Sequence, residues 1–257
     1  MADASKTARI ADTGSAATEA VPAPRRDMAL FLDFDGTLVD IAQAPDAVLV
    51  PPDLPIDLRR VRDLLGGALA IVSGRPLAAL DKYLGAAGLV FVGEHGAIYR
   101  NPGDRPSLET SMWPSEWNSS LDRFAADYPS LVVERKLSGI TIHYRLAPEQ
   151  SEIARGFGDQ LTAAHPEYAI FPAKMAWEIR HRDIGKASAV KFLMAQPPFA
   201  GRIPVFIGDD HADEAAIAAV GRMGGHGLHM ARAFANRSVR VREWLKSFAK
   251  LGQGDLQ

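Results

Sequence analysis

Short apolar runs alternate with helix-like segments along most of this chain, and polar residues follow directly after each run. Runs of strand length lie at 30–34, 68–72, 89–92 and 203–207. The segments between them have helical spacing, as at 57–65, which ends at the helix-stopping pair Gly66-Gly67. This alternation predicts a parallel sheet flanked by helices. Such sheets bind ligands at the carboxyl ends of their strands, so the polar residues there are the first candidates for a functional site.

The rhythm changes in the middle of the chain. After a loop-like stretch at 101–114, two helical segments (115–126 and 149–164) are interleaved with four short strand-like runs, and the first rhythm resumes at Ile184. This predicts a smaller α+β layer inserted into the sheet. The expected fold is therefore α/β. Its domains are a core at 27–107 and 183–257, a cap at 108–182, and a mobile N-terminal extension at 1–26, which is rich in Ala, Ser and Thr and has no secretory signal.

The bulk composition excludes several functions. A net charge of -2 gives no reason to expect nucleic-acid binding, and no apolar run is long enough to span a bilayer. Because the chain has no cysteine, any metal must be held by oxygen or imidazole ligands. The lack of cysteine also fits a reducing cytoplasm, where we expect the protein to be located. The sequence leaves the oligomeric state open and is compatible with a monomer.

Asp33 and Asp35 carry the strongest chemical signal, at the end of the first apolar run. Side chains alternate along a strand, so the two carboxylates would emerge on one side while Phe34 points to the other. Neighbouring carboxylates repel each other unless a cation such as Mg²⁺ offsets their charge. Gly36 permits a sharp turn behind them, and Thr37 adds a hydroxyl group. An Asp-x-Asp pair alone would mostly mark an ordinary strand end, so a site needs partners elsewhere.

Three further polar clusters follow apolar strands. The first is Ser73 with Arg75, a hydroxyl and a guanidinium suited to phosphate oxygens. The second is Lys186, at a helix start, where the ammonium and the helix N-terminus both favour an anion. The third is the run 208–214, whose candidate metal ligands are Asp209, Asp210 and Asp213. Each could be a turn cap, a solvated lysine or a set of helix-start charges, but their shared position after strands favours one common site.

These motifs resemble those of the haloacid dehalogenase-like (HAD) phosphohydrolases, and the resemblance is closer to one branch, the trehalose-6-phosphate phosphatases. The superfamily motifs are Asp33-x-Asp35-Gly-Thr-Leu, Ser73, Lys186 and Gly208-Asp209-Asp210. The branch-like strings are Ser73-Gly74-Arg75, Gly93-Glu94-His95-Gly96, Glu134-Arg135-Lys136 with Ser138, His143-Tyr144-Arg145, and Lys174 through Glu178-Ile179-Arg180. The resemblance covers about residues 28–230 and implies a HAD-like Rossmannoid core with an inserted cap.

The resemblance implies a Mg²⁺-dependent phosphatase that hydrolyses trehalose 6-phosphate through an aspartyl-phosphate. Asp33 would be the nucleophile and Asp35 the acid and base, while Ser73 and Lys186 would hold the phosphoryl oxygens. The implied metal ligands are Asp33, the backbone carbonyl of Asp35 and Asp209, with Asp210 and Asp213 as further candidates. The residues expected to bind the substrate, a small sugar phosphate, are Arg75, Glu94, His95, Gly96, Glu134, Lys136, Ser138, His143, Arg145, Lys174 and Glu178.

The chain departs from the family pattern at three places. Ala212 stands where a threonine is frequent, His181 stands where a proline is common, and a glycine precedes Lys186 instead of following it. These departures bear on the identity of the sugar more than on the reaction. The alternatives are a related sugar or glycosyl-glycerate phosphatase, a phosphomutase, and a non-catalytic sugar-phosphate sensor. A sensor would not need both a nucleophile and an acid.

Overall fold

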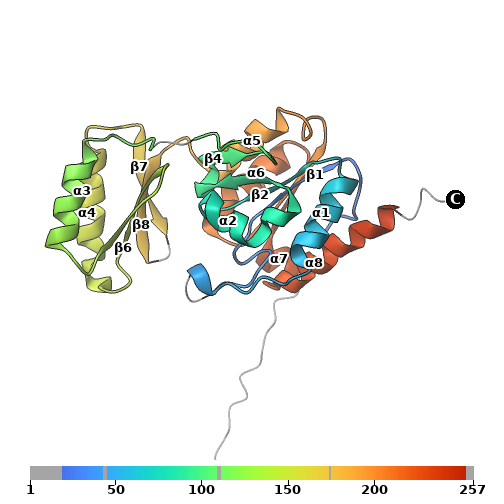
Figure 1. Cartoon of the computed structure of the whole chain (residues 1–257), viewed down its shortest axis with the longest axis horizontal. Coiled ribbons are helices and arrows are strands. Elements are labelled where there is room, and N and C mark those ends of the chain that lie inside the picture. Colours follow the sequence, from blue (N-terminus) through green and yellow to red (C-terminus); the bar gives the residue numbers. More distant parts are fainter. Residues whose placement is uncertain (1–18, 43–44, 109–110, 174, 253–257) are drawn as a thin grey trace, which may run out of the picture.

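The larger of two sheets has six strands and forms the core of the protein (Figure 1). The structure is a computed structural model and describes residues 19–42, 45–108, 111–173 and 175–252. The strand order is β10-β9-β1-β2-β3-β4. The strands are β1 (Met28–Leu32), β2 (Leu69–Val72), β3 (Val90–Gly93), β4 (Ile98–Arg100), β9 (Ile203–Gly208) and β10 (His226–His229). All neighbours are parallel except β3 and β4, so the predicted parallel sheet is confirmed.

Helices cover this sheet. They are α1 (Leu54–Leu64), α2 (Leu77–Leu84), α5 (Lys186–Met194), α6 (His211–Arg222), α7 (Met230–Phe234) and α8 (Ser238–Ser247). Every residue of β1, β2 and β3 is buried, which explains why these strands are continuous apolar runs. Leu32 at the end of β1 is paired with Ile71 of β2 and Ile207 of β9. The three strands therefore end at the same level, and the residues that follow them meet.

The smaller sheet and two helices form the cap (Figure 1). Its strands, all antiparallel in the order β5-β6-β8-β7, are β5 (Val132–Arg135), β6 (Gly139–His143), β7 (Tyr168–Ala173) and β8 (Ala176–His181). The helices α3 (Trp117–Asp127) and α4 (Ser151–Thr162) cover the face of this sheet that points away from the core. Short 3-10 turns lie at Pro45–Ala47, Gly85–Ala87, Glu94–Gly96, Pro148–Gln150 and Phe248–Gly252.

The two faces of the cap sheet differ in polarity. Ile140, Ile142 and Ile179 are fully buried in a cluster with aromatic residues of α3. On the opposite face, Thr141 of β6 is paired with Glu134 of β5 and with Glu178 of β8, which places three polar side chains in one row. Apolar and polar residues alternate along these strands. The apolar face of the sheet therefore packs in the hydrophobic cluster of the cap, and the polar face is turned towards the cleft.

Some elements differ from the sequence expectations. The helix expected at 213–219 begins at His211, because Asp210 caps it by accepting a hydrogen bond from the Asp213 amide. The strand β4 and the helix α7 have only three and five residues, too few for a periodic signal. The division into core and cap at 107/108 and 182/183 stays a prediction. It agrees with the presence of two separate hydrophobic clusters.

The N-terminal segment expected to be mobile lies only partly within the described residues, since the description starts at residue 19. From there the chain is held against α7 and α8. The Arg232 Nε donates to Glu19 Oε1 at 2.5 Å, and the Trp244 Nε1 donates to the Pro22 carbonyl at 2.8 Å. Within the part of the chain that the structure describes, no helix combines the length and the apolarity needed to cross a membrane.

Candidate active site

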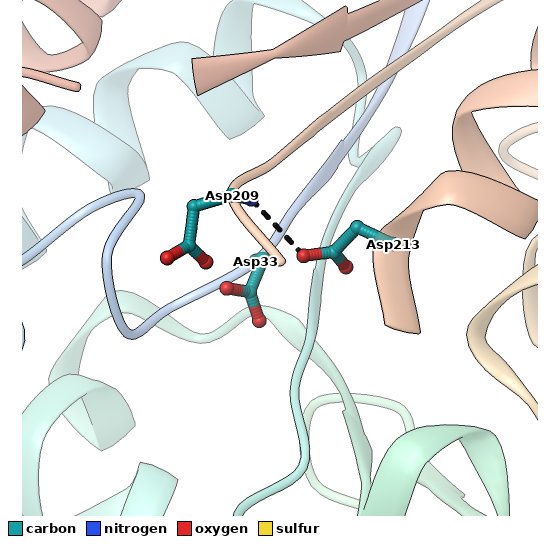
Figure 2. Close-up of side chains that lie close together, drawn as sticks. All are labelled: Asp33, Asp209 and Asp213. Atoms are coloured by element: carbon teal, nitrogen blue, oxygen red, sulfur yellow. Dashed lines mark hydrogen bonds between the residues drawn. The ribbon is translucent and has the colours of Figure 1, made fainter. Parts of the chain in front are cut away.

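An acidic cluster lies where β1 and β9 end side by side. Asp33, Asp209 and Asp213 each place a carboxylate oxygen within 4.8 Å of the others (Figure 2). Asp33 follows β1, Asp209 follows β9, and Asp213 is in the first turn of α6. Asp33 and Asp213 are buried and Asp209 is partly buried. The strand register thus brings together carboxylates that are about 180 residues apart in the sequence.

Lys186 joins this cluster from the start of α5. Its Nζ lies 2.7 Å from Asp33 Oδ1 and 2.7 Å from Asp213 Oδ1, and the side chain is 3% exposed. Burial opposes the charged ammonium, but the charges of Asp33 and Asp213 outweigh this effect and raise the pKa of Lys186. The lysine is therefore a fixed positive charge beside the side chain of Asp33.

The carboxylates carry more negative charge than Lys186 offsets. Burial raises the pKa of Asp33, against the opposing charge of Lys186, and the nearby Asp209 and Asp210 raise it further. Burial and the charges of Asp210 and Asp213 raise the pKa of Asp209 to about 6. Carboxylate oxygens are the preferred ligands of hard divalent cations, and such a cation would relieve this repulsion. The residues present therefore fit a divalent metal ion.

Asp213 also shapes the loop that carries Asp209. Its Oδ2 accepts from the backbone amides of Asp209 at 3.1 Å (Figure 2) and of Asp210 at 3.2 Å. Two glycines make room for these carboxylates. A Cβ on Gly208 would lie 2.3 Å from Asp213 Cγ, and one on Gly36, whose φ is +75°, would lie 2.0 Å from Asp209 Oδ2. The close approach of backbone and carboxylate therefore requires glycine at both positions.

Asp35 is held by Arg75. The Arg75 Nε donates to Asp35 Oδ2 at 2.6 Å, and its Nη2 donates to Oδ1 at 2.8 Å. The guanidinium lies over the rings of Phe34 and Tyr83, with centroid distances of 5.4 and 5.7 Å. The buried Ser73 hydroxyl accepts from the Arg75 amide at 3.2 Å. The structure thus places Ser73 and Arg75, which follow β2, beside the segment that follows β1.

The turn after β3 connects the core with the cap. Glu94 is 3% exposed, and its Oε2 accepts from the backbone amide of Ser138 at 2.7 Å and from its hydroxyl at 2.6 Å. The next residue, His95, has its Nε2 3.6 Å from Glu178 Oε1. Burial lowers the pKa of His95 to about 4, against the opposing charge of Glu178. The structure therefore pairs four of the residues expected to bind substrate with one another, and their role as sugar ligands stays a prediction.

A cleft of about 890 Å³ lies between core and cap. Its core side includes Asp35 and Arg75, and its cap side consists of Glu134, Lys136, His143 and Arg145. The His143 Nε2 is 2.9 Å from Glu134 Oε2, and this hydrogen bond lowers the pKa of Glu134. Candidates from both layers, Asp35 of the core among them, thus line one space.

The sequence interpretation missed part of this cleft. Ile41 and Asp46, in the loop after β1, also line it. That loop has no periodic pattern, and only the fold shows that it reaches the cleft. Gly96 touches the short linker 183–185, which leads from the cap into α5, since a Cβ there would lie 2.4 Å from the Gly185 carbonyl oxygen. Lys174, another expected substrate ligand, lies outside the described residues.

Comparisons with known proteins agree with this arrangement. The family model for trehalose-phosphatase matches residues 31–245. The probable trehalose-phosphate phosphatase of Sinorhizobium fredii is 42% identical over 200 residues, which are 77% of this chain and 75% of that protein. The trehalose-6-phosphate phosphatase of Escherichia coli is 32% identical over 215 residues, which are 83% of this chain and 81% of that protein.

A solved structure shows the same fold. The C-terminal domain of C. albicans trehalose-6-phosphate phosphatase aligns with a TM-score of 0.69 and 22% identity, covering 89% of this chain and 98% of that one. The family model spans most of the described chain, including both the residues after β1 and those after β9. On the family match and the two sequence relatives, this chain belongs to the trehalose-phosphatase family.

Proposed function

We propose that this protein hydrolyses trehalose 6-phosphate to trehalose and inorganic phosphate. The observation that carries the proposal is the buried Asp33 side chain, held 2.7 Å from the Lys186 ammonium and two residues before Asp35, which lines the cleft between core and cap. Membership of the trehalose-phosphatase family and the names of the sequence relatives support the substrate. The chemistry of the residues supports a phosphoryl transfer to a carboxylate.

In the first step, a carboxylate oxygen of Asp33 attacks the phosphorus atom and the bond to the sugar oxygen breaks. Asp35, which forms its two bonds with Arg75 as a carboxylate, takes up a proton when the substrate binds and donates it to that oxygen, so trehalose leaves as a neutral alcohol. Lys186 and Ser73 hold the phosphoryl oxygens. Without positive charge beside Asp33, the phosphate dianion and the carboxylate would repel each other, so Lys186 makes the attack electrostatically possible.

In the second step, water attacks the phosphorus atom of the aspartyl-phosphate. Asp35, now ionised, accepts a proton from that water, and the carboxylate of Asp33 is released with inorganic phosphate. The same residue therefore serves as acid and then as base. Its carboxylate is partly exposed at the cleft, where it can reach both the leaving oxygen and solvent.

We propose Mg²⁺ as the metal. Among the described residues, Asp33, Asp209 and Asp213 have oxygens close enough together to surround one ion, and oxygen ligands suit magnesium. When bound, the ion supplies positive charge for the phosphoryl oxygens. Asp213 already uses both oxygens, one for Lys186 and one for the loop amides, so we assign it the role of orienting Asp209. Asp210 caps α6 and is assigned no direct contact with the ion.

The cap would recognise the sugar. Glu134, Lys136, His143 and Arg145 offer donors and acceptors for hydroxyl groups along one side of the cleft. A site built for hydroxyls rejects analogues that lack them, because its polar groups would then be left without partners. This supports a disaccharide phosphate over a small monoester as the preferred substrate.

We also propose that the protein is located in the cytoplasm, which the lack of cysteine supports.

The test is phosphate release from a panel of sugar phosphates, with Mg²⁺ and after its removal by a chelator. We expect the highest kcat/KM for trehalose 6-phosphate and no turnover without metal. A clear preference for another sugar phosphate or a glycosyl-glycerate phosphate would overturn the substrate assignment. Phosphate that stays on the sugar at a new position would identify a mutase. Tight binding without phosphate release in the presence of Mg²⁺ would identify a sensor.

A further inference from the structure

The turn after β3 has an unusual backbone. Three successive residues have positive φ: Glu94 at 47°, His95 at 58° and Gly96 at 113°. Glutamate and histidine carry a Cβ that makes this region unfavourable, so a pair of them here persists only if the surroundings impose it. Backbone strain of this kind is concentrated at functional sites.

Each residue of the turn contacts the cap or its linker. The Glu94 carboxylate accepts three hydrogen bonds from the β5–β6 turn, two from Ser138 and one from the Leu137 amide at 3.4 Å. The His95 ring lies beside Glu178 of β8. Gly96 packs so closely on the linker that a Cβ would overlap the carbonyl group of Gly185. We call this set of contacts between core and cap the joint. Its core side is the left-handed turn Glu94–Gly96, and its other side consists of Leu137, Ser138, Glu178 and Gly185.

We propose that Glu94 is a positioning residue for substrate recognition: its buried carboxylate fixes the β5–β6 turn to the core and thereby sets where Glu134 and Lys136 stand in the cleft. This inference rests on the proposed function, since it assigns those two residues to the sugar. It gives Glu94 and Ser138 a role other than direct contact with the substrate.

Hydrogen bonds hold Glu134 and Lys136 in a fixed position relative to the turn that Glu94 binds. Lys136 is the last residue before the turn, and its amide donates to the Gly139 carbonyl at 2.9 Å, which closes the turn. Its own carbonyl accepts from the indole of Trp113 at 2.8 Å. Glu134 is paired with Thr141 in the same hairpin. A shift of the turn therefore moves Glu134 and Lys136 with it.

The strength of the contact follows from charge and burial. A carboxylate taken out of water is costly unless its oxygens accept strong hydrogen bonds. Bonds to an ionised acceptor are stronger than those between neutral groups, and Glu94 accepts three from one turn. Losing the charge at Glu94 should therefore loosen the turn. Ser138 contributes one of these bonds through its hydroxyl, so its removal should loosen the turn less.

The experiment compares Glu94→Gln and Ser138→Ala with the wild type. Asp159→Asn is the matched control, because it removes one negative charge from an ion pair with Arg155 within α4, which covers the face of the cap sheet that points away from the core. Two quantities are measured in each protein. The first is kcat and KM for trehalose 6-phosphate and for p-nitrophenyl phosphate, which has no sugar. The second is hydrogen exchange of the Leu137 and Ser138 amides without ligand.

For Glu94→Gln we expect a KM for trehalose 6-phosphate raised by about tenfold, with a change of less than about twofold for p-nitrophenyl phosphate. The Leu137 and Ser138 amides should exchange faster. Ser138→Ala should change the KM values and the amide exchange rates in the same directions but by smaller factors. If Glu94→Gln does not fold, the test rests on Ser138→Ala. Asp159→Asn should match the wild type in both measurements.

Unchanged exchange of the two amides in both variants would overturn the proposal, as would equal losses on the two substrates. A raised KM for the sugar phosphate with unchanged exchange would instead make Glu94 a direct sugar ligand. The exchange measurement needs no substrate. A wild-type protein that fails to hydrolyse trehalose 6-phosphate would therefore refute the proposed function, while the exchange data would still report on the joint.

Discussion

Arg75 donates two hydrogen bonds to Asp35, at 2.6 and 2.8 Å, and so occupies both carboxylate oxygens of the proposed acid. The arginine itself lies over the rings of Phe34 and Tyr83, which stack on each other, and its amide donates to the Ser73 hydroxyl. A planar fork on a planar carboxylate fixes orientation as well as distance. Asp35 is therefore held in one orientation at the wall of the cleft.

Replacing Arg75 should affect proton donation. Lysine keeps the charge but cannot form the paired bonds, so Arg75→Lys should lower kcat on trehalose 6-phosphate by about 100-fold. The loss on p-nitrophenyl phosphate should be much smaller, because its leaving group needs no proton. The control is Arg100→Lys, since Arg100 forms a similar pair with Asp81 and lies 5.6 Å from the Phe91 ring, outside the cleft. Equal losses on both substrates would show that Arg75 serves the phosphate and not Asp35.

Gly36 allows Asp209 to approach the segment after β1. Because an added Cβ would lie 2.0 Å from Asp209 Oδ2, Gly36→Ala should displace that carboxylate and weaken the metal site. We expect the Mg²⁺ concentration for half-maximal activity to rise by about tenfold or more. Gly103→Ala separates crowding from backbone strain, since Gly103 has a φ of +86° and nothing within 4 Å of the added atom. If Gly36→Ala and Gly103→Ala needed the same Mg²⁺ concentration for half-maximal activity, the role assigned to Gly36 would be refuted.

His95 should make stability depend on pH. Burial lowers its pKa to about 4 from the ordinary histidine value of 6.5, so between these values the unfolded chain binds a proton that the folded protein does not. The folded state therefore loses stability as pH falls through this window. The side chain is still 23% exposed, so we expect about 1–2 kcal/mol from this group.

The measurement is the free energy of urea unfolding at pH 7 and pH 4.5. His95→Gln should lose less stability between these two values than the wild type, because glutamine does not titrate. His226→Gln, at an exposed position, should behave as the wild type does. A loss in His95→Gln as large as that in the wild type would show that other groups cause the pH dependence.

Most of the core was predictable because its strands are buried on both faces. Such strands are apolar runs without alternation, and β1, β2, β3 and β9 were all identified in this way. Parallel strands end at one edge, so Asp33, Ser73, Lys186 and Asp209 could be grouped into one site before the strand order was known. The grouping of Asp33 with Lys186 and Asp209 is what the structure shows.

The joint between core and cap was not predictable in the same way. Glu94 and Ser138 are 44 residues apart, and their contact depends on the left-handed turn at Glu94 and on how the cap docks. No local pattern encodes either feature. The pairing of Arg75 with Asp35 was not predictable for a related reason, because a guanidinium and a carboxylate at strand ends both suit direct contact with the substrate. The residue types of Arg75 and Asp35 indicate their chemistry, but only the fold shows that the two side chains bind each other.

We assign Asp33 as the nucleophile of a trehalose-6-phosphate phosphatase. The most direct measurement is phosphate release from trehalose 6-phosphate with Mg²⁺ by the wild type and by Asp33→Asn, with thermal unfolding to confirm that both are folded. The amide keeps the shape of the side chain but removes the nucleophilic charge. We predict rapid release by the wild type and release at the uncatalysed background by Asp33→Asn. Appreciable turnover by the folded Asp33→Asn protein would contradict the assignment.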